Sequence, residues 1–304
     1  MNQKYKLTIA VITMNRCNQL EEALESCAAC DLPFETEFVI VNNASTDETE
    51  KIVNKFLQQH PSFPVKYEFS DINLGVGNGR ARAFELARGE FVYFLDDDAV
   101  IAKESRKTFF VDTLNYLERN QKVASLTTRI YDEMLVCDRE VEASKKSKID
   151  GLPIIFKFLG GSHFLRRESF TTPLYLDIKY GCEEYAPSIK VQAKGYFHVF
   201  DKHIFIIHKP KINKWVAGTA DREYVESRGC AVRYATKSML YPRLFRPLLW
   251  IAYECRCAKY LRSYSGAKKR TDALVKELLQ KHRCEKISCR MVIKLVREFG
   301  LTVL

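Results

Sequence analysis

Residues 91–98 read Phe-Val-Tyr-Phe-Leu-Asp-Asp-Asp, an apolar run that ends in three consecutive carboxylates. The apolar half has the side chains of a buried strand, so Asp96, Asp97 and Asp98 lie where that strand leaves a sheet. Ligands of α/β sheets bind beyond the carboxyl ends of the strands. Mg²⁺ and Mn²⁺ prefer oxygen ligands, and Mg²⁺ binds through one or two carboxylates together with substrate phosphates. The segment therefore predicts a site for a divalent metal and a phosphate ester, although solvated turns and helix N-termini also favour Asp.

Similar runs precede this segment along the chain. Residues 7–13, 37–42 and 64–69 are short β-branched or aromatic stretches, each followed by a polar turn that carries Asn or Asp. Between them, apolar residues recur at helical spacing in 18–29 and 46–59. The alternation predicts a mostly parallel α/β sheet with helices on both faces.

The later part of the chain is less regular. Helical patterns occur at 79–88, 103–119 and 183–194, whereas 121–166 reads as more irregular. At the start of an earlier helix, Asp47 is better placed as an N-cap than as a ligand.

The net charge of +10 is unevenly distributed. Residues 202–304 carry 23 Lys and Arg against 8 Asp and Glu, whereas the residues before them carry 25 against 30. Two long segments of the basic part, 243–262 and 271–299, read as amphipathic helices. We therefore expect an α/β domain at 1–220 and a basic helical region at 221–304.

Composition excludes several classes of protein. A chain of 304 residues with 46% hydrophobic residues can bury a large core, which argues against disorder and a fibrous fold. The sequence contains neither an apolar run long enough for a membrane span nor a signal peptide. Ten scattered cysteines favour reduced thiols in the cytoplasm over a disulfide scaffold. The CxxC of Cys27 and Cys30 lacks a second pair, which argues against a zinc site.

Seven motifs occur in a fixed order along the chain. They are VITMNR (11–16), VNNASTDET (41–49), NLGVGNGRA (73–81), GEFVYFLDDDA (89–99), GGSHFLRRESF (160–170), YGCEEYAPSIKVQAKGY (180–196) and IIHK (206–209). As an ordered set they resemble the family-2 inverting glycosyltransferases of the GT-A fold, over roughly two thirds of the chain. The resemblance implies a GT-A nucleotide-diphospho-sugar transferase sheet with flanking helices, to which the basic helical region is added.

The resemblance also implies a donor site. Thr13, Asn15 and Arg16 end the first strand, where such enzymes receive nucleobase and ribose, and an Arg fork can donate to two diphosphate oxygens. Asn43 stands where the family usually has an Asp that contacts the uracil imide. Because an amide both donates and accepts, uridine recognition remains open along with other bases. Arg80 falls where an Arg commonly faces the nucleotide phosphates.

The acidic triplet matches the family's DxD region. The resemblance implies that Asp98 binds the metal, that Asp96 holds the ribose or binds the metal through water, and that Asp97 shares either task. His208 stands where the family has a His that can coordinate the metal or touch the diphosphate, and imidazole beside carboxylates suits Mn²⁺. The expected cofactor is Mn²⁺ or Mg²⁺.

An inverting transfer needs a carboxylate that takes the proton of the acceptor hydroxyl. The family places this base in an acidic pair thirteen positions, counted inclusively, before a Gly-aromatic pair, and Glu183 to Gly195 reproduce that spacing. Glu184 then stands at the usual Asp, with Glu183 as the alternate base, while Ala186 replaces an acid often found two residues later. Both glutamates could instead complement a helix dipole.

Three further features bear on ligands and partners. Gly160 and Gly161 allow a sugar to approach the backbone, and Trp215 could stack on an acceptor sugar or close a core edge. The basic helices suit an anionic membrane surface or a packing and dimerisation module, and no specific nucleic-acid motif accompanies their charge.

The sequence thus predicts a metal-dependent inverting glycosyltransferase of the hexosyltransferase type. Its donor would be a UDP-sugar, with dTDP-sugar as the second choice, and its acceptor a saccharide or a lipid-linked glycan in surface polysaccharide biosynthesis. We expect it in the cytoplasm or at the inner face of the cytoplasmic membrane, as a monomer or a homo-oligomer.

Two alternatives remain open. A non-catalytic sugar-nucleotide-binding or scaffolding protein would explain the departures at Asn43, Glu184 and Ala186. An NAD-dependent oxidoreductase is disfavoured, because the GxGxG within 73–81 follows the third strand rather than the first and lacks a ribose-binding acid.

Overall fold

The computed structural model describes residues 5–178, 181–211, 220–261 and 264–304. Its strands are β1 (Tyr5–Thr13), β2 (Thr36–Asn43), β3 (Val65–Ser70), β4 (Gly89–Asp96), β5 (Ala99–Ile101), β6 (Val123–Asp132), β7 (Cys137–Asp138), β8 (Ala143–Ile149), β9 (Leu152–Ile155), β10 (Ser162–Arg166) and β11 (Phe197–His208). Its α-helices are α1 (Cys17–Ala28), α2 (Thr49–Gln59), α3 (Gly75–Leu86), α4 (Val111–Arg119), α5 (Tyr185–Ala193), α6 (Ala220–Leu240), α7 (Arg246–Tyr260), α8 (Tyr264–Lys281) and α9 (Cys289–Phe299).

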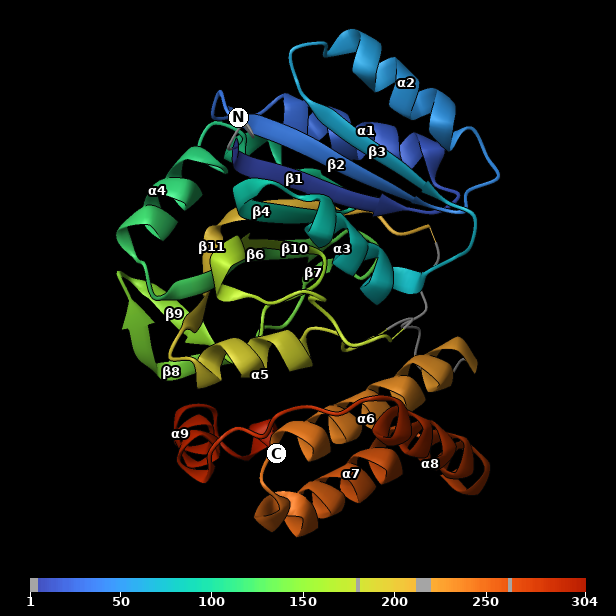
Figure 1. The fold of residues 1–304 in the computed structure, drawn as a ribbon, viewed down its shortest axis with the longest axis vertical. Coiled ribbons are helices and arrows are strands. Elements are labelled where there is room, and N and C mark those ends of the chain that lie inside the picture. Colours follow the sequence, from blue (N-terminus) through green and yellow to red (C-terminus); the bar gives the residue numbers. More distant parts are fainter. Residues whose placement is uncertain (1–4, 179–180, 212–219, 262–263) are drawn as a thin grey trace.

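These strands form one mixed sheet in the order β3-β2-β1-β4-β10-β6-β11-β9-β8, with β5 paired to β11 and β7 to β6 (Figure 1). The first four strands are parallel to one another, because helices connect them in succession. β10 runs antiparallel to both β4 and β6, whereas β11 is parallel to β6. The prediction of a mixed α/β sheet with flanking helices is confirmed.

Strand register brings the polar ends of several strands together. Ile12 of β1 lies opposite Asp96 of β4, and Thr13 lies opposite the end of β2. β5 pairs with β11 so that Ala99 faces His208. Since Ala99 follows Asp98 directly, the sheet itself places the histidine beside the acidic triplet.

The sheet is packed on both faces. One buried cluster joins β1, β2 and β4 to α1, α2 and α4, and a second joins the opposite face to α3. The rings of Tyr93, Phe109, Phe110 and Phe164 lie within 4.5–5.8 Å of one another in the first cluster. This aromatic packing holds β4, and with it the acidic triplet, firmly in place.

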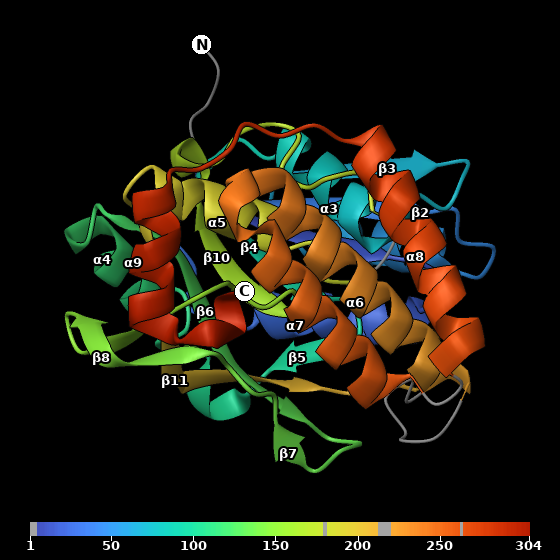
Figure 2. The same cartoon turned by 90° about the horizontal axis from the view of Figure 1, so that it is seen from below.

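The C-terminal helices form a layer beside α5, below the sheet in Figure 1 and in front of it in Figure 2. Tyr185 and Ile189 of α5 share a buried cluster with Val232 of α6 and Val292 of α9. The Lys237 ammonium donates to the backbone oxygens of Thr302 and Leu304 at 3.3 and 2.8 Å. The boundary near residue 220 stays a prediction. A division there would separate α5 from α6 and α9, which share this buried cluster.

Three expected elements are corrected by the structure. The region 103–119 is helical only as a 3₁₀ turn (Lys103–Ser105) followed by α4, and 121–166 contains five strands, β6 to β10. The region 271–299 is divided into α8 and α9. Among the described helices, none combines the length and apolar content that crossing a bilayer requires.

Candidate active site

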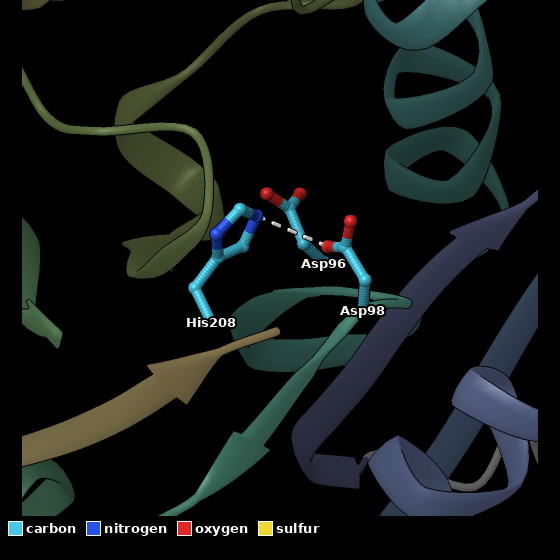
Figure 3. Close-up of side chains that lie close together, drawn as sticks. All are labelled: Asp96, Asp98 and His208. Atoms are coloured by element: carbon cyan, nitrogen blue, oxygen red, sulfur yellow. Dashed lines mark ion pairs between the residues drawn. The ribbon is translucent and has the colours of Figure 1, made fainter. Parts of the chain in front are cut away.

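Asp96, Asp98 and His208 form a cluster at the ends of β4 and β11 (Figure 3). One donor atom from each residue lies within 4.8 Å of the others, and the His208 Nε2 is 3.2 Å from the Asp98 Oδ1. Ligand atoms around one Mg²⁺ or Mn²⁺ ion, each at about 2.0–2.4 Å, fall within that span. Two carboxylates and an imidazole are also a suitable donor set for Mn²⁺. The residues present therefore fit a divalent metal ion.

Asp132 orients the proposed histidine ligand. This buried residue ends β6, and its Oδ2 lies 3.0 Å from the His208 Nδ1. Its other oxygen accepts the backbone N–H groups of Met134 and Leu135 at 3.2 and 3.0 Å. A proton on Nδ1, donated to Asp132, leaves the Nε2 lone pair, which now faces Asp98 and Arg139, as the atom that would bind a metal. Burial lowers the pKa of His208, but the hydrogen bond and charge of Asp98 outweigh it, so that the pKa is raised.

Arg16 neutralises the other end of the acidic triplet. Its Nη1 lies 2.7 Å from the Asp97 Oδ1 and 2.9 Å from the Asp98 Oδ2. Asp97 is buried next to Thr13, and burial raises the pKa of its carboxyl to about 6 although Arg16 opposes the shift. Arg16, the predicted phosphate ligand, thus lies beside the candidate metal ligand Asp98, and its side chain is partly exposed.

Arg80 lies beneath the site rather than facing open space. Its Nη2 is 2.5 Å from the Asp96 Oδ1 and its Nη1 is 2.9 Å from the Glu183 Oε1. Burial alone would raise the pKa of Asp96, but the charges of Arg80 and His208 lower it to about 2. The buried Arg80 guanidinium therefore links Asp96 of the candidate metal set to Glu183 at the start of α5.

Glu183 and Glu184 lie side by side at the N-terminus of α5, and both are buried. Burial and then the charge of Glu184 raise the pKa of Glu183 to about 7. The Glu183 Oε2 has no hydrogen-bond partner in the described part of the chain. One carboxyl of the pair is thus held close to the pKa that suits proton transfer at neutral pH.

The two glycines before β10 make room for these side chains. A Cβ on Gly160 would lie 2.6 Å from both the Arg80 Nη1 and the Glu184 Oε1, and a Cβ on Gly161 would lie 3.1 Å from the Asp96 Oδ2. A sugar was expected to approach the backbone of these two glycines. In the structure, the side chains of Arg80, Glu184 and Asp96 lie close to it.

The two predicted asparagines have different surroundings. Asn15 adopts φ 53° and accepts the Thr46 backbone N–H at 2.7 Å, which ties the end of β1 to the β2–α2 loop. Asn43 ends β2 and donates to the Gly75 oxygen at 3.1 Å, while its own Oδ1 lacks a donor among the described residues. Asp47 accepts the backbone N–H groups of Cys17 and Thr49, but the N-cap of α2 is Glu48, so the expected N-cap is off by one residue.

Besides Asp132, two residues near the site, Arg139 and Tyr175, were not indicated by the sequence. Arg139, on the segment after β7, places its Nη2 2.9 Å from the His208 Nε2. Tyr175 is buried near Arg80 and Glu184, and its hydroxyl has no hydrogen-bond partner in the described ranges. Neither residue lies in a motif of the ordered set. Trp215, the candidate acceptor contact, lies outside the described residues.

The sequence matches the family model described as Glycosyl transferase family 2 over residues 8–167. It is 38% identical over 105 residues to the poly(ribitol-phosphate) beta-N-acetylglucosaminyltransferase TarS of Staphylococcus aureus (strain Mu50), which covers 34% of this chain and 18% of that protein. It is 30% identical over 100 residues to the abequosyltransferase RfbV of Salmonella typhimurium, which covers 33% of this chain and 30% of the relative. The chain thus spans less than a third of the length of these two curated relatives.

Solved structures share the fold at low sequence identity. Staphylococcus aureus TarS in complex with UDP-GlcNAc matches with a TM-score of 0.65 at 16% identity, over 98% of this chain and 89% of that one. A mannosyltransferase from Pyrobaculum calidifontis, in complex with GDP-Man and Mn²⁺, matches with a TM-score of 0.59 at 16% identity, over 97% and 80% of the two chains. These likenesses confirm the predicted GT-A fold.

Proposed function

This chain belongs to glycosyltransferase family 2, and on that premise we propose that it is an inverting, metal-dependent glycosyltransferase of the hexosyltransferase type. It moves a sugar from a nucleotide-diphosphate donor to a hydroxyl of a saccharide or lipid-linked acceptor. The observation that carries the proposal is the chain of contacts from the Asp96, Asp98 and His208 cluster through Arg80 to Glu183. It joins a candidate metal-binding set to a buried acid pair, and a metal-dependent inverting transfer needs both.

The donor lies over the ends of β1, β2 and β4 in this proposal. Thr13, Asn15 and Arg16 contact the nucleoside and the diphosphate, and the Asn43 Oδ1 accepts a nucleobase imide N–H, a donor that it lacks in the structure. An imide N–H is present in uracil and thymine, so a UDP-sugar is favoured and a dTDP-sugar is second. Among the structural neighbours, TarS was solved with UDP-GlcNAc.

Asp98 and His208 would hold Mn²⁺ or Mg²⁺ together with Asp96. When bound, the metal would offset the charge that develops on the leaving nucleoside diphosphate. The guanidinium groups of Arg16 and Arg139 lie at the edges of this cluster and can pair with diphosphate oxygens. Asp97 keeps Arg16 in place.

Glu184 acts as the base, with Glu183 as the alternate. As the acceptor oxygen attacks the anomeric carbon, the carboxylate takes the hydroxyl proton and the nucleoside diphosphate leaves from the opposite side. Arg80 holds Glu183 at 2.9 Å and so fixes the N-terminus of α5 against the donor side of the site.

We place this activity in the assembly of a surface polysaccharide at the cytoplasmic face of a membrane. Two relatives are named as a poly(ribitol-phosphate) beta-N-acetylglucosaminyltransferase and an abequosyltransferase. The partners are a nucleotide-sugar donor, a glycan or lipid-linked acceptor and an anionic membrane surface.

The base is tested with Glu184→Gln. We expect the rate of nucleoside diphosphate release from a UDP-sugar with Mn²⁺ to fall by roughly 10²–10⁴, while nucleotide binding measured by calorimetry is unchanged. Glu168→Gln, an exposed glutamate after β10, is the matched control and should keep full activity. Loss of nucleotide binding together with activity would refute the role of Glu184, and nucleotide binding without turnover in the wild type would favour the non-catalytic alternative.

A further inference from the structure

Helix α7 has apolar side chains on two opposite faces. Leu249, Tyr253 and Cys257 are buried against the neighbouring helices. On the other side, an apolar stripe is exposed, formed by Leu248, Ile251, Cys255 and Ala258 of α7 and by Leu244 of the 3₁₀ turn Arg243–Phe245 just before it. Leu244 is 77% exposed, Leu248 49% and Ile251 57%. We call this stripe the α7 face.

The α7 face lies at the outside of the molecule. α6 lies between α7 and the sheet in Figure 1, and α7 is in the foreground when the molecule is seen from below in Figure 2. A helix of 15 residues is about 22 Å long, so the face is an extended apolar surface on the side opposite the sheet. Surfaces of this kind mark interaction sites on proteins.

Positive charge surrounds the face. Arg243 and Arg246 are exposed at its N-terminal end and Lys259 is exposed near its C-terminal end. The segment 240–253 contains no Asp or Glu, and Glu254 is paired to the Lys268 ammonium at 3.0 Å. Lys286 belongs to the same group of cations, because after burial the charges of Arg246 and Arg243 lower its pKa.

The apolar side chains and the surrounding cations indicate what binds to the α7 face. A second copy of the chain would bring the same cations against one another, and two heptads of apolar spacing are too short for a stable coiled coil. Apolar side chains bordered by Lys and Arg instead match an interface of acyl chains and anionic headgroups. The aliphatic stems of the Arg and Lys side chains can lie along the apolar boundary while their charged ends reach phosphates.

We propose that the α7 face docks on an anionic phospholipid surface. Leu244, Leu248 and Ile251 enter the boundary of the acyl chains, and Arg243, Arg246 and Lys259 contact headgroup phosphates. The proposal adds a contact face to the membrane partner of the proposed function, and it holds or fails without regard to sugar transfer.

The test is co-sedimentation of the full chain with vesicles of phosphatidylcholine alone and of phosphatidylcholine with phosphatidylglycerol, without donor or metal. We expect binding to the anionic vesicles only, weaker at high salt. Leu248→Gln with Ile251→Gln, and separately Arg243→Gln with Arg246→Gln, should each weaken that binding at least tenfold. Because the four side chains are exposed, both double variants should keep the wild-type Tm.

The matched controls are Phe34→Gln, an almost fully exposed aromatic of the α1–β2 connection, and Lys66→Gln with Lys107→Gln, two exposed cations of the α/β part. Both should bind as the wild type does. The proposal is overturned if the wild type does not bind anionic vesicles, or if the α7 variants bind as well as the controls. It is also overturned if the apolar double variant turns a dimer into a monomer and leaves vesicle binding intact. Nucleoside diphosphate release from a soluble donor, measured in parallel, reports separately on the proposed function.

Discussion

Asp96 and Glu183 are ion-paired to the same guanidinium, yet their carboxyl pKa values move in opposite directions. Arg80 and His208 lower the pKa of Asp96 to about 2 in spite of its burial, whereas burial and the neighbouring Glu184 raise the pKa of Glu183 to about 7. A carboxylate of the candidate metal set and a carboxyl that exchanges its proton near neutral pH are thus separated by one side chain. Burial acts on both carboxyls, and the neighbouring charges set the direction of each pKa shift: Arg80 and His208 outweigh burial at Asp96, whereas Glu184 adds to it at Glu183.

This difference predicts a pH-dependent gain of stability in Glu183→Gln. The folded protein holds the Glu183 proton up to about pH 7, whereas the ordinary pKa is 4.5. Between these values the folded state binds more protons, so wild-type stability falls as pH rises, and the loss is complete above pH 7. Gln does not titrate. We expect equal Tm values near pH 4.5 and a Tm higher by roughly 2–5 °C in the variant at pH 8.

Scanning calorimetry across that pH range measures the effect. Glu168→Gln, which changes an exposed glutamate, should show a constant difference from the wild type. A Glu183→Gln variant that is less stable than the wild type at pH 8 would mean that the ionised form is stabilising, contrary to the account.

At the residue scale, the sequence identified several members of the site but not their contacts. Asp96, Asp98 and His208 lie together as a candidate metal set because β5, which begins directly after Asp98, pairs with the end of β11 that carries His208. The buried position of Arg80 was not predictable, because its partner Glu183 is 103 residues away in the chain. Arg139 and Tyr175 come from segments with no recognisable motif. The proposed roles of all these residues remain predictions.

Among the elements, the connection between β9 and β10 decides how closely the site can be packed. Gly160 lies where the side chains of Arg80 and Glu184 come together, and these leave no room for a Cβ atom. The Arg80 Nη1 and the Glu184 Oε1 would each lie 2.6 Å from that Cβ. Neither can move away easily, because Arg80 is held by two ion pairs and Glu184 is buried.

Gly160→Ala should therefore damage activity more than stability. The added methyl group pushes Arg80 or Glu184 from its position, and we expect at least a tenfold fall in the rate of nucleoside diphosphate release, since a misplacement of about 1 Å costs on the order of 10² in rate. The matched control is Gly229→Ala in α6, where the nearest atom to the new Cβ is the Cys182 Sγ at 3.7 Å. Full activity in Gly160→Ala would show that these side chains do not need that space.

Element prediction succeeded where the periodicity was strong and failed where it was broken. The ends of the four N-terminal strands were predicted to within two residues, because each is rich in β-branched and aromatic residues and is followed by a polar turn. The strands between 121 and 166 were missed since polar residues such as Thr127, Thr128 and Ser162 are buried in them. These polar residues interrupt the apolar pattern of a buried strand, yet they are hydrogen-bonded inside the sheet, where the Thr128 and Tyr93 hydroxyls both lie within hydrogen-bond distance of the Ser162 hydroxyl.

For the whole molecule, the main architectural fact is that α5 joins the candidate site to the core of the C-terminal helices. Its N-terminus carries the acid pair, and its buried side packs on α6 and α9. The basic region was predicted from charge, but its contact with α5 was not, because charge patterns carry no information on which apolar face meets which. The C-terminal helices therefore pack against α5, whose N-terminus carries the proposed base Glu184, and they also carry the α7 face.

A shared core predicts a single thermal unfolding transition. We expect Val232→Ala, which removes two methyl groups between α6 and α5, to lower the Tm of that transition by roughly 2–5 °C. Leu301→Ala changes a side chain that is 73% exposed and should leave the Tm unchanged. Two separate transitions, with only one of them shifted by Val232→Ala, would mean that the helical region folds independently.

The central claim is that Asp98 and His208 hold a metal through which a sugar nucleotide binds. The most direct measurement is a thermal-shift panel of UDP, dTDP and GDP and of their sugars, each with and without Mn²⁺, on the wild type, Asp98→Ala and the exposed control Asp138→Ala. Binding at 100 times Kd adds about 2.7 kcal/mol of stability.

The account predicts that UDP compounds with Mn²⁺ raise the Tm of the wild type and of Asp138→Ala by several degrees, and that Asp98→Ala shows no such shift. A wild type that no nucleotide stabilises, or an equal metal-dependent shift in Asp98→Ala, would contradict it.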